Sequence, residues 1–179
     1  MLIIACVCIL AIAGLDQLIK AWITANFQLY EERPFLHIGS LDIMHLKYIE
    51  NTGSAFSSFS GQRVLLLTVT GIATVVCIFL LVRYALKGRP LLFWSLTMII
   101  GGGIGNMIDR IFHGGAVIDY LDLQLFDFAI FNFADCFVTV GTALLFIYIL
   151  FFMDKKKPTI EEEPQIAPPQ EESEHDDEA

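Results

Sequence analysis

Charged residues are scarce in this chain, and several long stretches have almost none. Asp, Glu, Lys and Arg make up 17% of the 179 residues, whereas apolar residues make up 55%. This balance excludes an ordinary soluble domain, whose surface needs more polar side chains. We expect no nucleic-acid partner, because the chain has only 11 basic residues and a net charge of −9.

Cysteines are few, and their spacing forms no recognisable pair. The four are Cys6, Cys8, Cys77 and Cys136. They form no CxxC motif, and no two of them share a predicted loop. A disulfide framework is therefore excluded, and so is a membrane thiol oxidoreductase that uses paired cysteines in its loops.

Long apolar runs are the main positive feature of the sequence. Four of them have about the 20 residues that a helix needs to cross the hydrocarbon core of a bilayer. They are residues 2–22, 64–86, 90–110 and 132–153. The chain shows no internal repeat, so the pattern predicts one membrane domain over residues 1–157.

Basic residues are distributed unevenly between the predicted loops. Arg83, Lys87 and Arg89 lie in the short second loop, and three lysines follow the fourth span, whereas the third loop, residues 111–131, has no Lys or Arg. The positive-inside rule therefore places the second loop and both termini in the cytoplasm. The first loop, residues 24–63, and the third loop are then expected on the outer face.

Negative charge is concentrated at the C-terminal end. Residues 158–179 hold nine of the 20 acidic residues and no Lys or Arg, so the rest of the chain has 11 acidic and 11 basic residues. A segment so rich in Glu and Pro has too few apolar residues to fold. We predict that it is a disordered acidic tail in the cytoplasm.

Both outer loops contain short strand patterns. Residues 35–38 and 41–49 flank a two-residue turn at Gly39 and Ser40, which predicts a hairpin. In the third loop, residues 121–125 alternate between leucine and polar side chains, which predicts another strand. The expected fold class is an all-α membrane protein of four transmembrane helices with a small extracytoplasmic β-sheet.

Polar residues remain inside the predicted spans, where a charge costs about 2.5–3.5 kcal/mol on insertion scales. Asp16 and Lys20 are four residues apart in the first span and are expected to pair. The third span ends in one polar face, and the fourth begins with another. The residues of these two faces are Asn106, Asp109 and Arg110, and Asn132 and Asp135. We interpret Asp109 as an organising residue beside Arg110.

Asp119 and Asp135 differ from the other acids because neither has a cation one helical turn away. The short third loop is expected to bring them together. Two neighbouring carboxyl groups share a proton, and such a pair activates a water molecule and protonates a departing amide without a metal or cofactor. The alternative is a small ion-coupled transporter that uses Asp16, Asp109 and Asp135; broken spans and repeated halves would favour it, and the sequence has neither.

Five short blocks resemble the signature motifs of the lipoprotein signal peptidase family, also called signal peptidase II, in the family's order. They are DQLIK (16–20), NTGSAFS (51–57), GNMIDR (105–110), VIDY (117–120) and FNFAD (131–135). Each block alone is weakly specific. Five blocks in order on a four-span scaffold are highly specific, and none departs from the family's pattern.

The resemblance implies an aspartic endopeptidase of the bacterial inner membrane, with its active site toward the periplasmic face. It would cleave the signal peptide from diacylglyceryl-modified prolipoproteins just before the lipidated cysteine, as a monomer in contact with membrane lipid. Asp119 and Asp135 would be the catalytic pair. The resemblance further implies two sets of polar residues: substrate-binding or dyad-supporting residues Asn51, Asn106, Arg110 and Asn132, and structural residues Asp16, Lys20 and Asp109. Residues 53–59 resemble a mobile element over the site.

Overall fold

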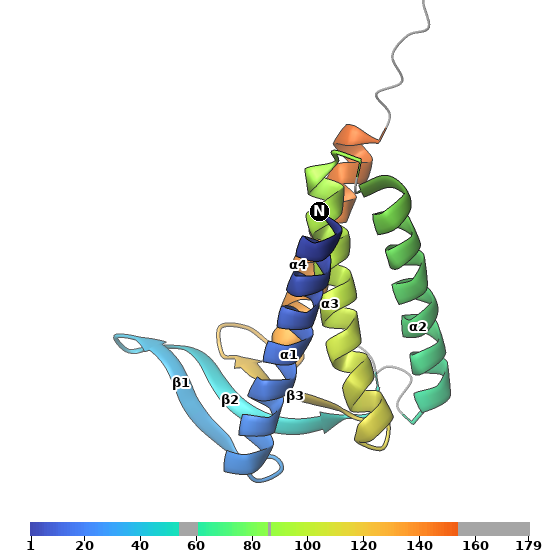
Figure 1. Ribbon diagram of the computed structural model, residues 1–179. Helices are drawn as coiled ribbons and strands as arrows, with labels where there is room; N and C mark the ends of the chain where they lie inside the picture. Colours follow the sequence, from blue (N-terminus) through green and yellow to red (C-terminus); the bar gives the residue numbers. More distant parts are fainter. Residues whose placement is uncertain (54–60, 86, 154–179) are drawn as a thin grey trace, which may run out of the picture.

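The computed structural model describes residues 1–53, 61–85 and 87–153 as a helical bundle with a small sheet at one end (Figure 1). The elements in chain order are α1 (Leu2–Asn26), β1 (Glu32–Ile38), β2 (Leu41–Asn51), α2 (Arg63–Leu80), the π-helical turn η2 (Leu81–Ala85), α3 (Pro90–Phe112), β3 (Val117–Leu123) and α4 (Phe133–Phe152).

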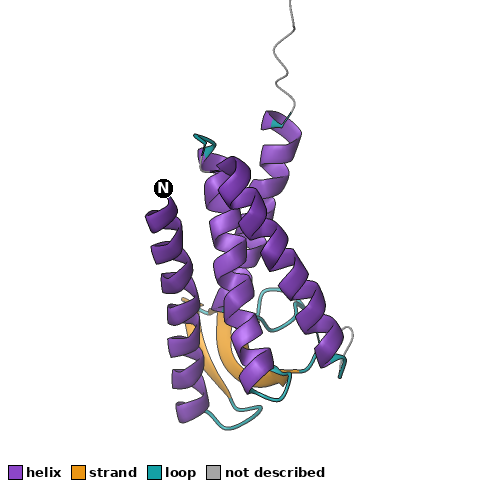
Figure 2. Cartoon of the chain, turned by 45° about the vertical axis from the view of Figure 1, so that its right-hand side comes forward, coloured by secondary structure: helices purple, strands orange, loops and turns teal. Residues whose placement is uncertain are grey.

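All four predicted spans are helices in the part of the chain that the structure describes, and each is long and apolar enough to cross a bilayer. The second span combines α2 with η2. The first helix extends to Asn26, beyond the predicted end at residue 22. The sheet lies at one end of the bundle, and the N-terminus and the α2–α3 connection lie at the other (Figures 1 and 2).

The central helix is α3, which packs against α1, α2 and α4. Pro90 stands in its first turn, where a proline costs no hydrogen bond. A Cβ atom on Gly101 would lie 2.9 Å from Ile12 Cβ, and one on Gly102 would collide with the backbone carbonyl of Ala134. The glycine run therefore lets α1 and α4 approach the α3 backbone closely.

The three strands form an antiparallel sheet in the order β1-β2-β3. The predicted hairpin is confirmed, and its turn lies at Gly39, whose φ of 62° favours glycine. The third strand was predicted at residues 121–125, but it runs from Val117 to Leu123. Pairing decides this difference, because β3 aligns with β2 from Asn51 opposite Val117 to Met44 opposite Leu123.

Two buried apolar clusters stabilise the two ends of the bundle. The cluster near the α2–α3 connection includes Phe93, Leu96 and Ile100 of α3. The cluster beside the sheet contains Ile23, Phe27, Tyr48, Ile118 and Tyr120. Along α1, the buried Asp16 and Lys20 lie between the residues of these clusters. The bundle therefore encloses a polar layer between two apolar layers.

Candidate active site

Lys20 is the centre of the polar layer and is almost completely buried, with 1% of its side chain exposed. Its Nζ lies 2.8 Å from Asp16 Oδ2, as the spacing predicted, and 2.7 Å from Asp109 Oδ2 on α3. It also donates to Asn106 Oδ1 at 3.0 Å. A buried charge needs such partners, so this ion-pair network joins α1 to α3.

The interpretation of Asp109 as an organising residue is consistent with its contacts, although its cationic partner is Lys20 rather than Arg110. Asp109 Oδ2 accepts a hydrogen bond from the backbone N–H of Ile118 at 3.1 Å, which anchors the start of β3. Gln17 Nε2 donates to Asp109 Oδ1 at 2.8 Å. Gln17 was not among the predicted site residues; its polarity within a span was the available signal.

Two asparagine side chains connect Lys20 to the two candidate catalytic aspartates. Asn132 Nδ2 donates to Asp119 Oδ1 at 2.6 Å and to Asn106 Oδ1 at 3.0 Å. Asn106 Nδ2 donates to Asp135 Oδ1 at 2.7 Å. Asp119 and Asp135, which come from a strand and a helix, are therefore held by one continuous hydrogen-bonded chain.

The first turn of α4 gives Asp135 its orientation. Asn132 is the N-cap residue, and its side chain accepts from the Asp135 N–H at 2.9 Å while Asp135 Oδ2 accepts from the Asn132 N–H at 3.1 Å. This reciprocal pair is a capping box. Asp16 Oδ1 accepts from the Ala134 N–H at 3.0 Å, so the network on α1 also caps the start of α4.

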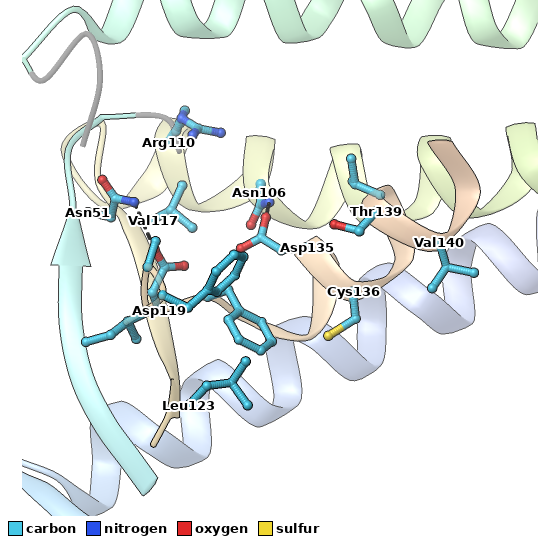
Figure 3. Close-up of a pocket in the computed structure, with 15 residues that line it drawn as sticks. Asn51, Asn106, Arg110, Val117, Asp119, Leu123, Asp135, Cys136, Thr139 and Val140 are labelled. Atoms are coloured by element: carbon cyan, nitrogen blue, oxygen red, sulfur yellow. Dashed lines mark hydrogen bonds between the residues drawn. The ribbon is translucent and has the colours of Figure 1, made fainter. Parts of the chain in front are cut away.

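A pocket of about 600 Å³ opens beside this network (Figure 3). Its charged and amide lining residues are Asn51, Asn106, Arg110, Asp119 and Asp135. Its apolar wall includes Phe128 and Phe131 before α4, and Val138 and Val140 within it. Figure 3 shows the Asp119 carboxyl group beside Asn51 and the Asp135 carboxyl group beside Asn106.

The electrostatic environment of Asp119 favours its protonated form. Burial, followed by the nearby Asp135 carboxylate, raises the pKa of Asp119 to about 7. Hydrogen bonds from Asn51 Nδ2, at 2.9 Å, and from Asn132 partly oppose this rise, because they favour the ionised form. A carboxyl group that holds its proton near neutral pH can act as a general acid.

Arg110 lines the pocket with a buried side chain that is 8% exposed. One of its Nη atoms donates to the Gly53 carbonyl at 3.1 Å, whereas its Nε has no hydrogen-bond partner among the described residues. An unsatisfied buried donor is costly, so this arrangement suits a site that a polar ligand completes.

The structure separates the predicted residues into two groups. The pocket is lined by five of them, Asn51, Asn106, Arg110, Asp119 and Asp135. Asn132 does not line the pocket, but it donates a hydrogen bond to Asp119. Asp16, Lys20 and Asp109 do not line it. The transporter alternative uses Asp16, Asp109 and Asp135 to bind the transported ion. Lys20 already pairs with Asp16 and Asp109, which argues against an ion-binding role for these two.

Two predictions lie outside the residues that the structure describes: most of the mobile element at residues 53–59, and the acidic tail at 158–179. Among the described residues, no group of three or more His, Cys, Asp or Glu side chains is arranged to hold a metal ion.

The fold and the site define a class, a four-helix membrane protein with two carboxyl groups in one pocket, which is the arrangement of a membrane aspartic peptidase. Residues 8–151 match the family model described as signal peptidase (SPase) II. The chain belongs to the signal peptidase II family of aspartic peptidases.

Several similar proteins are named lipoprotein signal peptidase, and three of them illustrate the range. The protein from Lactococcus lactis subsp. cremoris (strain MG1363) is 41% identical over 135 residues, which cover 75% of this chain and 85% of the relative. The protein from Streptococcus thermophilus (strain CNRZ 1066) is 40% identical over 143 residues, which cover 80% of this chain and 90% of the relative. The protein from Clostridioides difficile (strain 630) is 36% identical over 152 residues, which cover 83% of this chain and 96% of the relative.

A solved structure of a bacterial membrane enzyme, obtained by the in meso method, has the same fold. It superimposes with a TM-score of 0.75 and covers 86% of this chain and 92% of its own, at 24% sequence identity. Its likeness supports the fold, a four-helix bundle with a sheet. The four apolar helices and the bacterial relatives identify this chain as a bacterial membrane protein.

Proposed function

We propose that this protein removes the signal peptide from diacylglyceryl-modified prolipoproteins by cleaving just before the lipidated cysteine. Asp119 and Asp135 are the catalytic pair. The observation that carries the proposal is that both carboxyl groups line one pocket and are joined through Asn106 and Asn132. The relatives' name and the family match support the substrate class.

The proposed reaction uses one proton shared by the two carboxyl groups. Asp135 accepts a proton from a water molecule as the water oxygen attacks the scissile carbonyl carbon. Asp119, whose pKa is raised to about 7, donates its proton to the departing amide nitrogen. The resulting bond breakage yields a carboxyl group and an amine, and proton exchange with solvent restores the pair.

The lining of the pocket suits this substrate. Asn51 and the unsatisfied Arg110 Nε lie on its polar side, where they can bind backbone carbonyls of an unwound signal peptide. The opposite wall, formed by residues such as Phe128 and Val140, is apolar. A peptide that carries hydrocarbon chains needs both kinds of surface.

Orientation in the membrane is part of the proposal. The basic second loop and both termini face the cytoplasm, and the sheet and the pocket face the outer side of the cytoplasmic membrane, where lipid-modified precursors have their cleavage sites. The end of the bundle that carries the sheet is opposite the Arg83, Lys87 and Arg89 loop, which fits the positive-inside rule.

The test is cleavage of a diacylglyceryl-modified precursor by the purified Asp119→Asn and Asp135→Asn variants. Each should lose activity by about 10³-fold or more, because each removes one of the two proton-transfer groups. Asp122→Asn is the matched control: it lies on the same strand, but its carboxylate faces Lys47 at 3.9 Å. Near-normal cleavage by either of the first two variants would refute the assignment, and equal cleavage of an unlipidated precursor would refute the substrate class.

A further inference from the structure

The start of α4 is held by its own capping box and by side chains from two other elements, α1 and β3. A helix leaves its first four N–H groups without partners inside the helix. The N–H groups of Asn132 and Asp135 are satisfied within the capping box, and that of Ala134 by Asp16. The remaining one, the N–H of Phe133, donates to the Tyr120 hydroxyl oxygen at 3.2 Å.

This hydrogen bond joins the two elements that carry the catalytic pair. Tyr120 follows Asp119 on β3, and Phe133 stands two residues before Asp135 on α4. The backbone reinforces the same junction, because the N–H groups of Tyr120 and Leu121 both donate to the Phe131 carbonyl, at 3.0 and 2.8 Å. The strand and the helix are therefore fixed to each other close to both aspartates.

The position of the Tyr120 hydroxyl is itself well determined. The side chain is 3% exposed and belongs to the apolar cluster with Ile23, Phe27, Tyr48 and Ile118. Burial raises the pKa of the Tyr120 phenol, so the group stays neutral and acts as a hydrogen-bonding partner. A ring held in a packed cluster gives its hydroxyl little freedom to move.

We propose that Tyr120 is a positioning residue for the reaction: its hydroxyl holds the first turn of α4 against β3 and thereby sets the separation of the Asp119 and Asp135 carboxyl groups. This inference rests on the proposed function. Proton sharing depends on that separation, and a displacement of about 1 Å in a catalytic group can cost about 10²-fold in rate. Tyr120 itself is not among the residues that line the pocket.

The test compares Tyr120→Phe with Tyr48→Phe. Both tyrosines belong to the same cluster, and each substitution removes one hydroxyl while it keeps the ring. The Tyr48 hydroxyl donates to Glu50 on its own strand at 2.8 Å, so its removal leaves the contact with α4 intact. The charged groups around the pair, which are Asp16 and Lys20 on α1 and Asp109 and Arg110 on α3, remain in both variants.

We expect Tyr120→Phe to lower kcat roughly 10-fold while KM stays within about twofold, because the reacting groups and not the binding surface are displaced. The alkaline limb of its pH–rate profile should move to lower pH, since a more distant Asp135 raises the pKa of Asp119 less. Tyr48→Phe should change neither quantity. Wild-type kcat and profile in Tyr120→Phe, or the same losses in Tyr48→Phe, would overturn the inference.

A second variant, Phe133→Pro, removes the N–H that donates to the Tyr120 hydroxyl. It tests the same hydrogen bond if Tyr120→Phe does not fold. Phe133 is the first residue of α4, where proline is tolerated, and Asn132 before it is extended, with φ −131° and ψ 179°, as proline requires. Phe133→Pro should lower kcat further than Phe133→Ala, which loses the ring alone. Equal values for these two variants would also contradict the role of Tyr120.

The same assay separates this inference from the proposed function. Asp119→Asn is measured beside the tyrosine variants. If Asp119→Asn is inactive and Tyr120→Phe is fully active, only the positioning role fails. If Asp119→Asn is active, the catalytic assignment fails, and the role of Tyr120 fails with it.

Discussion

Side-chain amides have a particular use in this site because each carries both a donor and an acceptor. Asn106 accepts from Lys20 and Asn132 through Oδ1 and donates to Asp135 through Nδ2. Asn132 donates to Asp119. A carboxylate in either place would add negative charge beside the pair, and an apolar residue would break the chain of hydrogen bonds. Two amides therefore connect a buried lysine to two aspartates without changing the charge.

A prediction at the residue scale concerns pH. Because the pKa of Asp119 is raised to about 7, kcat/KM should fall above about pH 7 as its proton is lost. Asn51 donates to the ionised form of Asp119, so Asn51→Ala should raise this pKa and move the alkaline limb to higher pH. Initial rates measured from pH 5 to 9 test both expectations, and a limb that stays in place or moves to lower pH in Asn51→Ala would contradict the second.

Among the elements, α3 connects the polar residues of α1 with those of α4. It contributes Asn106, Asp109 and Arg110, and its glycines bring α1 and α4 close enough for Asp109 to contact Lys20 and for Asn106 to contact Asp135. A Cβ atom on Gly105 would lie 2.7 Å from Asp16 Oδ2 and 3.2 Å from Ala134 Cβ. The absence of a side chain at Gly105 therefore allows both the close packing of α3 against α4 and the position of Asp16 in the polar network.

Gly105→Ala should consequently destabilise the folded protein by about 1–3 kcal/mol, the usual cost of overpacking, because Asp16 must move away from Lys20. Thermal unfolding in detergent measures the change. Gly71→Ala on α2 is the control, since its Cβ would meet nothing within 4 Å. That variant should be neutral or slightly more stable, as alanine is the better helix former. Equal melting temperatures for the two variants would argue against the packing explanation.

How far the sequence predicts the elements follows from the forces involved. The four spans were predicted with small errors at their ends, because the transfer of about 20 apolar residues dominates all local preferences. The third strand was placed too late, because the alternation at residues 121–125 is a weak local signal. Its true range, Val117–Leu123, is set by pairing with β2. Just after its end, the Gln124 N–H still donates to the Ile43 carbonyl of β2.

At the scale of the whole molecule, the bundle has two chemically different ends. One end has the sheet, the pocket and the third loop, which lacks Lys and Arg. The other has the N-terminus and the loop with Arg83, Lys87 and Arg89 (Figure 1). By the positive-inside rule, this asymmetry supports the proposed orientation, in which the sheet and the pocket face the outer side.

The corresponding prediction uses single cysteines added at the two ends. Ser40→Cys lies in the exposed turn of the hairpin, and Lys87→Cys lies in the exposed basic loop. A maleimide that does not cross membranes should label Ser40→Cys in intact cells, but Lys87→Cys only after permeabilisation. The unsubstituted protein, with its four cysteines, gives the background. The opposite labelling pattern would place the pocket in the cytoplasm and contradict the orientation.

The sequence by itself determined the four spans, the uneven charge and the candidate residues, because these depend on composition and on contacts within a few residues. Asp16 and Lys20 are one helical turn apart, so their pairing was predicted. The tertiary structure alone decided that Lys20 also binds Asp109, that Gln17 donates to Asp109, and that the Tyr120 hydroxyl accepts from the Phe133 N–H. These contacts join residues on different elements, and only the rotation and close approach of the packed elements bring their side chains together.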